Sequence, residues 1–221
     1  MRWTGPVLLD SRLVVVAPHP DDEVLLAGGL MRWSARQGRE VVVVAVTDGE
    51  ASHARSHRVS PAALRARRAL ERVEALARLG VPEITLHRLG EPDQGCADRV
   101  ADIATALHAI VDASDVVVVP SRHDRHPDHV AVSLAARCAA DGRAATWCEA
   151  PTWALVHGTA DPPTTTLELD TVSWAAKQHA VAAYRSQLEA LGPDPEDGPV
   201  VHPHELAVLV TRREQFHATA V

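Results

Sequence analysis

The sequence has little of what several protein classes depend on. Its three cysteines, Cys96, Cys138 and Cys148, are an odd number without a CxxC pair, so they indicate neither a disulfide framework nor a thiolate metal site. Its longest apolar runs are too short to cross a bilayer, and residues 1–10 lack the basic start and apolar core of a signal peptide. We therefore expect a cytoplasmic protein with no membrane partner.

Positive charge is also scarce. The 22 lysine and arginine residues are outnumbered by 29 aspartate and glutamate residues, which gives a formal net charge of -7. Because phosphate contacts need a basic surface, this balance argues against nucleic acid as a partner. It is compatible with a cationic small-molecule ligand or product.

Histidine, by contrast, is abundant. The chain has 13 histidines beside one tyrosine and one phenylalanine, which makes imidazole readily available for metal binding or acid–base chemistry. With 221 residues and 46% hydrophobic content, the chain is long enough to bury one substantial core. We expect a single domain over residues 1–221.

Short apolar runs alternate with helical patterns along the chain. Valine-rich runs predict buried strands, and apolar residues at helical spacing predict the helices between them. The predicted strands are 13–17, 41–46, 84–87, 116–119, 145–149 and 164–170, and the predicted helices are 24–37, 61–79, 98–112, 127–140 and 173–190. This order predicts an α/β fold with a Rossmann-like, mostly parallel sheet covered by helices on both faces.

Two clusters of histidine and aspartate each follow a buried strand. The first, PHPDDE at 18–23, comes directly after the strand 13–17, and the second, HDRHPDH at 123–129, follows the strand 116–119. In open parallel sheets, ligands bind outside the carboxyl ends of the strands. We therefore expect both clusters to converge there into one active site. The alternative is that each cluster is only an aspartate-rich turn with histidines that cap a helix.

Imidazole nitrogens and carboxylate oxygens are ligands suited to zinc or a similar divalent ion such as Fe²⁺. A catalytic zinc ion usually takes three protein ligands and leaves one position for water. His19, one of Asp21 and Asp22, and one of His126 and His129 would complete such a site. The other aspartate would face the metal-bound water as a base. The residues alone do not say which aspartate has which role.

Both clusters resemble the two signature motifs of the LmbE-like, or PIG-L, deacetylase family. This family includes the N-acetylglucosaminyl-phosphatidylinositol, mycothiol-pathway and bacillithiol-pathway deacetylases. PHPDDE at 18–23 and HPDH at 126–129 match the motifs, and weaker matches elsewhere follow the family's order. The weaker matches are Thr47 to Glu50, Arg68 with Glu71, Leu89 to Asp93, Lys177, and Tyr184 to Gln187. The resemblance covers most of the chain and implies a zinc-dependent N-deacetylase of amino sugars or amino-sugar-containing metabolites.

The resemblance also implies roles for individual residues. By it, His19, Asp22 and His129 bind the zinc ion, and Asp21 is the general base. His126 would stabilise the oxyanion or protonate the leaving amine.

Four further residues are candidates for supporting roles. Asp128 either accepts a hydrogen bond that orients His126 and raises its pKa, or caps a helix. Arg68 and Asp93 resemble sugar-contacting residues of characterised relatives, although Arg68 could instead lie on a solvated basic helix face. Some relatives carry an aromatic residue at the position of Asp124 that assists the oxyanion. Asp124 either shapes the substrate site in its place or leaves this assistance absent.

Two other functions remain open. An amidase that removes a larger N-acyl group, or cleaves a thiol-conjugate amide, would use the same metal and residues and differ only in its acyl pocket. A non-catalytic metal-binding protein would be expected to lack the base or the transition-state histidine, whereas Asp21 and His126 are both present.

The loop 48–60 follows the second predicted strand and contains His53 and His57. Its position would allow it to close over the site as a lid. The sequence is compatible with a homo-oligomer but identifies no interface and no particular substrate.

Overall fold

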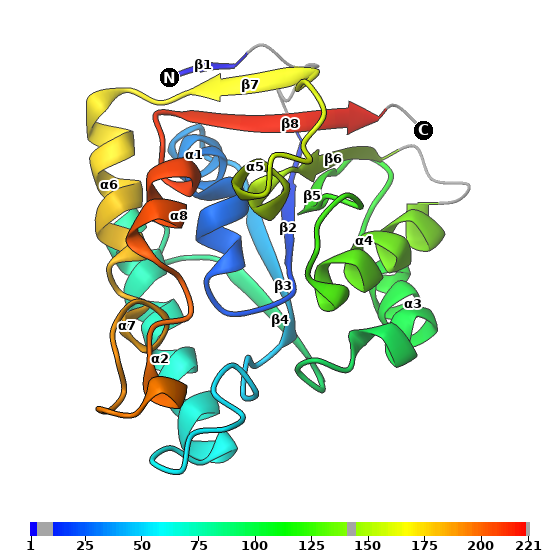
Figure 1. Ribbon diagram of the computed structural model, residues 1–221. Coiled ribbons are helices and arrows are strands. Elements are labelled where there is room, and N and C mark those ends of the chain that lie inside the picture. The colour runs from blue at the N-terminus through cyan, green and yellow to red at the C-terminus, as the bar shows by residue number, and fades with distance from the viewer. Residues whose placement is uncertain (4–10, 141–144, 220–221) are drawn as a thin grey trace.

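The structure is a computed structural model that describes residues 1–3, 11–140 and 145–219 (Figure 1). Its centre is an eight-stranded sheet in the order β1-β7-β8-β6-β5-β2-β3-β4. The strands from β6 to β4 in this order pair in parallel, whereas β8, β7 and β1 add antiparallel pairs at the other edge. The expected α/β class with a mostly parallel sheet is therefore confirmed.

The strands are β1 (Arg2–Trp3), β2 (Leu13–Ala17), β3 (Val41–Thr47), β4 (Thr85–Glu91), β5 (Val116–Pro120), β6 (Thr146–Ala150), β7 (Thr165–Glu168) and β8 (Arg213–Thr219). The α-helices are α1 (Asp22–Arg36), α2 (Pro61–Leu79), α3 (Val100–Ile110), α4 (Pro127–Ala140), α5 (Thr152–Val156), α6 (Thr171–Val181), α7 (Arg185–Leu188) and α8 (Pro203–Leu209). Two short 3₁₀ helices are η1 (Cys96–Arg99) and η2 (Pro195–Asp197). Among the described residues, no helix combines the length and apolar character needed to cross a membrane.

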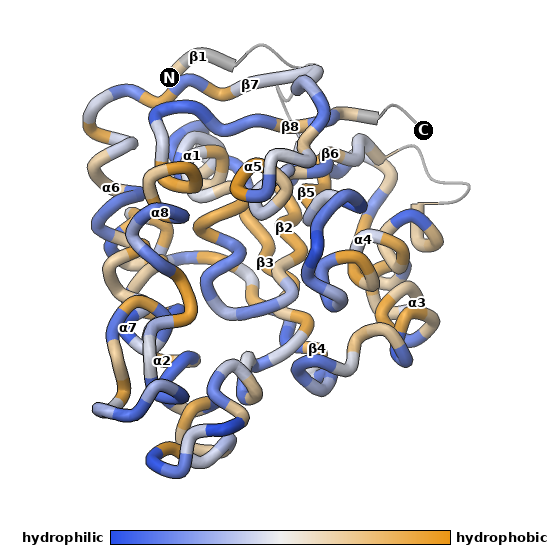
Figure 2. The backbone as a smooth tube through the Cα atoms, in the orientation of Figure 1, coloured by the Kyte–Doolittle hydropathy of each residue, from blue (hydrophilic) through white to orange (hydrophobic). Residues whose placement is uncertain are grey.

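Helices cover both faces of the sheet. Because successive side chains of a strand point to opposite faces, Leu13 and Val15 of β2 join the core beneath α1, whereas Val14 and Val16 join the core beneath α3 and α4. In Figure 1, α1, α2 and α6 lie on one side of the sheet, and α3 and α4 lie on the other. The strands between these layers form the hydrophobic centre in Figure 2. Burial on both faces explains why these strands are continuous apolar runs.

The C-terminal third differs most from the sequence-based prediction. The predicted helix 173–190 is wrong as one element, because α6 ends at Val181 and a turn through Tyr184 separates it from α7. This turn brings the buried Tyr184 hydroxyl within 2.9 Å of the Glu23 carboxylate. No strand was predicted for β8, which pairs with both β6 and β7. Its sequence, REQFHAT, contains no apolar run that would have revealed it.

Helix α1 is kinked at Ala27, whose φ of -146° is not helical. The kink frees backbone groups that would otherwise bond within the helix. Glu214 accepts hydrogen bonds from the N–H groups of Gly29 and Leu30, at 2.7 and 2.9 Å. Lys177 donates to the carbonyl of Leu25 at 3.1 Å and to Glu214 at 2.6 Å. The buried ion pair between Lys177 of α6 and Glu214 of β8 therefore provides hydrogen-bond partners for the backbone groups that the kink in α1 leaves free.

Candidate metal centre

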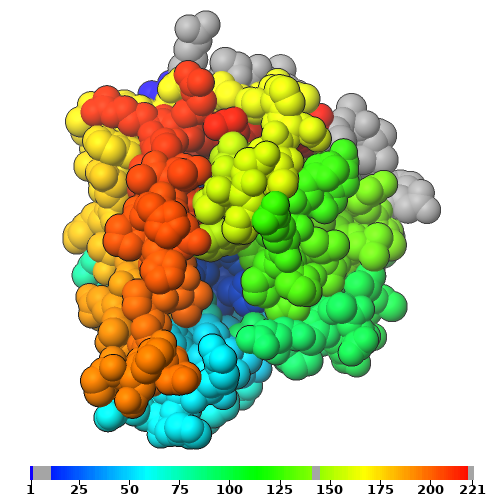
Figure 3. All heavy atoms as spheres, in the orientation of Figure 1, coloured from blue at the N-terminus to red at the C-terminus, as the bar shows by residue number. Residues whose placement is uncertain are grey.

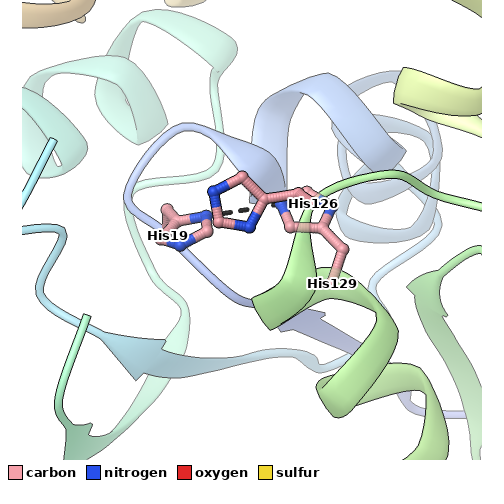
Figure 4. Close-up of side chains that lie close together, drawn as sticks. All are labelled: His19, His126 and His129. Atoms are coloured by element: carbon pink, nitrogen blue, oxygen red, sulfur yellow. Dashed lines mark hydrogen bonds between the residues drawn. The ribbon is translucent and has the colours of Figure 1, made fainter. Parts of the chain in front are cut away.

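The two clusters meet at the carboxyl ends of β2 and β5. These strands pair in parallel, with Val15 beside Val118, so the loops that follow them leave the same edge of the sheet. The chain places β3 and β4 on one side of β2 and places β5 and β6 on the other, which makes this boundary the topological switch point. Figure 4 shows His19 from the loop after β2 beside His126, which directly precedes α4, and His129 from the first turn of α4.

Three buried side-chain atoms form a small triangle at this point. Oδ2 of Asp22 lies 3.2 Å from Nδ1 of His19 and 3.1 Å from Nε2 of His129. The two histidine nitrogens lie 3.3 Å from each other. All three residues are buried, so few water molecules compete for these atoms.

The spacing of the triangle fits a tetrahedral metal ion. Zinc binds histidine nitrogen and carboxylate oxygen at roughly 2.0–2.2 Å, so two ligand atoms of a tetrahedral site are separated by roughly 3.3–3.6 Å. The observed separations of 3.1–3.3 Å lie at or within about 0.2 Å below the lower end of this range. Two histidines and one aspartate also leave one coordination position for water or substrate. His19, Asp22 and His129, the residues that the motifs indicated, could therefore hold a zinc ion.

His126 offers a second grouping with His19 and His129, in which the ligand atoms lie within 4.8 Å of one another. This grouping is wider than the triangle that contains Asp22. The ring centroid of His126 lies 4.7 Å from that of His19 and 5.1 Å from that of His129. His126 is also exposed, unlike the other two histidines. Its position suits a residue that acts beside the metal better than a metal ligand.

Carboxylates on the outer side of His19 and His129 fix the orientation of their rings. Asp124 places Oδ2 at 3.1 Å from Nδ1 of His129. Asp128 and Asp93 place carboxylate oxygens at 3.1 and 3.2 Å from Nε2 of His19. Each ring therefore presents its other nitrogen to the triangle. Such outer partners select the tautomer of a metal-binding histidine and increase its basicity.

These contacts change two assignments made from the sequence. The carboxylate of Asp128 does not orient His126 as expected, because it accepts from His19 and from the backbone N–H groups of Gln94 and Cys96. Asp124 was expected to shape the substrate site, but its carboxylate holds His129 and the N–H group of His126, and it is not part of the cavity wall. Both aspartates contact the histidine ring nitrogens that face away from the triangle.

Asp21 lies beside the triangle in a backbone conformation that is rare for any residue except glycine. Its φ is 141°, which costs on the order of 1–3 kcal/mol and requires support from surrounding contacts. Oδ1 of Asp21 lies 3.4 Å from the guanidinium group of Arg68. Burial raises the pKa of Asp21 to about 7, although Arg68 opposes this rise. A carboxylate with a pKa near neutrality is suited to accept and release a proton.

His126 has one ring nitrogen engaged by the backbone. Its Nδ1 accepts a hydrogen bond from the N–H group of Asp128 at 3.2 Å, so the neutral ring carries its proton on Nε2. Burial lowers the pKa of His126, and the neighbouring His19 and His129 lower it further. Asp128 raises the pKa of His126 as expected, but its effect does not offset burial and the two neighbouring histidines. A neutral ring with a proton on Nε2 can still donate a hydrogen bond to a bound oxygen atom.

Arg68 and Asp93 both line the cavity next to the triangle, but their polar atoms are largely engaged by the protein. Arg68 is buried, which excludes the solvated helix face, and it donates to the carbonyl groups of Gly49 and Pro20 at 3.0 and 2.6 Å. Asp93 contacts His19 and accepts from the N–H group of Ala51 at 2.7 Å. Direct sugar contact by either residue stays a prediction.

A cavity of about 160 Å³ opens over the triangle, and Asp21, Arg68 and His126 reach it. Figure 3 shows a hollow at this place, between the surfaces of the C-terminal segment, the loop 48–60 and the loop before α4. Sequence reasoning placed Gln187 only within the matched stretch 184–187 and Ser52 only within the loop 48–60. It missed the other wall residues, which are Gln94, Trp153, Val200 and Val201.

The loop 48–60 packs against the segment that follows α7. His53 donates from Nε2 to the carbonyl of Gly198 at 3.1 Å, and Ser56 donates to Asp197 at 2.6 Å. His57 is exposed. The loop therefore contributes to the cavity wall through Ser52, and its closing as a lid stays a prediction.

Known proteins resemble this chain in both sequence and fold. A Mycobacterium sp. (strain KMS) protein named 1D-myo-inositol 2-acetamido-2-deoxy-alpha-D-glucopyranoside deacetylase is 36% identical over 148 residues, covering 55% of this chain and 47% of the relative. A Bacillus cereus protein named probable N-acetyl-alpha-D-glucosaminyl L-malate deacetylase 2 is 29% identical over 133 residues, covering 58% of this chain and 60% of the relative. The chain thus spans about half the length of these relatives.

A solved structure supports the fold over nearly the whole chain. The N,N'-diacetylchitobiose deacetylase from Pyrococcus horikoshii superposes with a TM-score of 0.67 and 21% identity, covering 95% of this chain and 84% of that one. The family model described as PIG-L, GlcNAc-PI de-N-acetylase, matches residues 14–140 and so includes both histidine clusters. The chain therefore belongs to the PIG-L family.

Proposed function

We propose that this protein is a zinc-dependent hydrolase that removes an acetyl group from the nitrogen of an amino sugar or an amino-sugar-containing metabolite. The triangle formed by His19, Asp22 and His129 carries this proposal, because its spacing suits a tetrahedral ion with one open position. Asp21 and His126 reach the same cavity, which supports catalysis over mere metal storage. Relatives named as deacetylases of N-acetylglucosaminyl compounds support the substrate class.

The proposed reaction needs proton transfers that this chain's residues could carry out. When bound, zinc supplies Lewis-acid polarisation of the amide carbonyl and lowers the pKa of a water molecule. The Asp21 carboxylate accepts a proton from the attacking water. His126 donates a hydrogen bond from Nε2 to the oxygen on which negative charge develops. The proton that Asp21 accepted then passes to the nitrogen as the carbon–nitrogen bond breaks, and the products are an amine and a carboxylate.

Zinc is proposed over Fe²⁺ although both fit a set of two histidines and one carboxylate. Amide hydrolysis transfers no electrons between substrate and metal, so a redox-active ion offers no advantage. The nearly tetrahedral spacing of the ligand atoms also suits zinc.

The size of the cavity favours a small acyl group. Its volume of about 160 Å³ lies below the roughly 300–1,000 Å³ of sites that enclose drug-sized ligands. An acetyl group attached to a sugar ring fits this limit better than a long acyl chain does. The amidase for larger acyl groups or thiol conjugates is therefore the second candidate. It would use the same metal and the same residues and differ only in its acyl pocket.

The test is a comparison of amine release from matched substrates by the zinc-loaded protein. The substrates are N-acetylglucosaminyl inositol, N-acetylglucosaminyl malate and N-octanoylglucosaminyl inositol, and the His126→Ala variant is the control. We expect amine release from at least one acetylated compound and none from the octanoyl compound. Preference for the octanoyl compound would favour the amidase. Failure with all N-acyl compounds would contradict the proposed activity.

A further inference from the structure

Glu23, the last residue of PHPDDE, has no place in the metal triangle, yet it is fully buried beside it. Its carboxylate accepts hydrogen bonds from three different parts of the chain. Oε2 accepts from the N–H group of Asp21 at 3.2 Å. Oε1 accepts from Arg72 at 3.1 Å and from the hydroxyl of Tyr184 at 2.9 Å. Glu23 therefore links the Asp21 backbone to α2 and to the turn after α6.

The peptide group between Pro20 and Asp21 is held from both of its ends. Its N–H group donates to Glu23, and its carbonyl oxygen accepts from Arg68 at 2.6 Å. Arg68 and Arg72 lie four residues apart on α2, so they face the same side of this helix. One side of α2 thus supports the peptide group directly through Arg68 and indirectly through Arg72 and Glu23.

These contacts hold the backbone at Asp21, whose conformation is unfavourable. Asp21 has a φ of 141°, and a residue with a side chain keeps such a conformation only when surrounding contacts impose it. Rotation of the Pro20–Asp21 peptide group would change the direction in which the Asp21 side chain leaves the backbone. That side chain reaches the cavity and lies 3.4 Å from Arg68.

We infer that Glu23 is a positioning residue that, together with Arg68, fixes the Pro20–Asp21 peptide group and so directs the Asp21 carboxylate at the substrate. The inference rests on the proposed function, in which Asp21 is the base. Glu23 itself does not touch the cavity and transfers no proton. Its effect is to keep Asp21 in the one orientation that serves the reaction.

The test substitutes Glu23→Gln, which keeps the size of the side chain but replaces one acceptor oxygen with an amide. The remaining oxygen is best placed toward the two donors Arg72 and Tyr184, which leaves the amide nitrogen against the N–H group of Asp21. The substitution therefore removes the Asp21 contact in particular.

Glu71→Gln is a closely matched control. Glu71 is also buried, and it also accepts from a backbone N–H group, a hydroxyl and an arginine. The first two belong to Ser186 and the third to Arg67, so none of these bonds involves Asp21. A general effect of neutralising a buried glutamate would appear in both variants.

Two readouts are measured on the zinc-loaded protein. In Glu23→Gln, we expect kcat to fall roughly 10- to 100-fold with KM and bound zinc unchanged, because the carboxylate is misdirected and the metal ligands are not. We also expect the Asp21 amide proton, followed by NMR, to exchange with solvent about tenfold faster or more. In Glu71→Gln, both readouts should stay at wild-type values.

An unchanged kcat or an unchanged Asp21 exchange rate in Glu23→Gln would overturn the inference, as would an equal effect of Glu71→Gln. If Glu23→Gln does not fold, Tyr184→Phe removes one of the donors that anchor Glu23. This variant should show smaller changes of both readouts in the same directions, and wild-type values for both would overturn the inference. If no N-acyl compound is hydrolysed, the proposed function fails, whereas the exchange rate still tests the hold on Asp21.

Discussion

Oδ2 of Asp124 lies 3.1 Å from Nδ1 of His129, and this contact turns Nε2 of the same ring toward Asp22 and His19. Both partners are buried, so water does not readily replace the carboxylate. A residue that the sequence suggested for the substrate site thus orients a histidine of the proposed metal site.

Replacement of Asp124 should weaken metal binding. In Asp124→Ala the His129 ring loses the acceptor that fixes its orientation and tautomer, and we expect zinc affinity to fall roughly 10- to 100-fold. Competition with a chromophoric chelator measures this affinity. Asp161→Ala is the control, because Asp161 contacts the surface residue His123 and not a metal ligand. Equal zinc affinities for Asp124→Ala and the wild type would contradict the role of Asp124.

Replacement of Asp21 should separate catalysis from metal binding. Asp21→Asn keeps the shape of the side chain but removes the base, so we expect turnover to fall about 10²- to 10⁴-fold. Zinc content should remain at the wild-type level, because Asp21 is not part of the ligand triangle. Steady-state kinetics and metal analysis of the same sample check both points. Wild-type turnover would show that another group accepts the proton.

The metal-free protein should lose stability as the pH rises. Burial lowers the pKa of His129, but Asp22 and Asp124 outweigh this effect and raise it to about 9. The unfolded chain has a histidine pKa of about 6.5, so the folded state binds this proton more tightly. The resulting stabilisation is complete below about pH 6.5 and is lost as the pH rises through about 9.

The stabilisation of the folded protein by zinc should increase as the pH rises, because protons compete with zinc for the same nitrogen atoms. We therefore expect the difference in Tm between the zinc-loaded and metal-free proteins to increase from pH 6.5 to pH 9. Thermal unfolding of both forms over this range measures it. A difference that shrinks with rising pH would mean that His129 is not a shared site for proton and metal.

The ion pair between Lys177 and Glu214 should be needed for stability. In Lys177→Met the Glu214 carboxylate stays buried without its cation, and such a loss costs about 3–5 kcal/mol of unfolding free energy. Urea unfolding measures the change. Arg213→Met is the control, because its ion pair with Glu168 is exposed. A loss in Lys177→Met no larger than in Arg213→Met would exclude a structural role for the buried pair.

The sequence predicted the parallel part of the fold, and the convergence of the two histidine clusters, for physical reasons, whereas the choice of His19, Asp22 and His129 as metal ligands came from the family resemblance and stays a prediction. Valine runs such as 41–46 mark strands that are buried on both faces. The loops that follow the two strands at the switch point lie side by side at the same edge of the sheet. PHPDDE and HPDH each follow such a strand within a few residues. Little tertiary information is needed to bring His19, Asp22 and His129 together.

The supporting contacts could not be predicted in the same way. Whether Asp128 faces His126 or His19 depends on side-chain directions at the start of α4 and across two loops. Trp153 and Val200 reach the cavity from α5 and from an irregular C-terminal segment, where no periodic pattern fixes their direction. β8 lies between β6 and β7 in the antiparallel part of the sheet and has a largely polar sequence, so hydrophobicity gave no signal for it.

The most direct test of the central claim is a titration of zinc into the metal-free protein, with acetate release measured at each step. The account predicts no activity without metal and a linear rise that ends near one zinc ion per chain, because every candidate grouping of ligands in the described residues includes His19. The same titration of His129→Ala should show no saturating rise. Full acetate release by the metal-free protein would contradict the account.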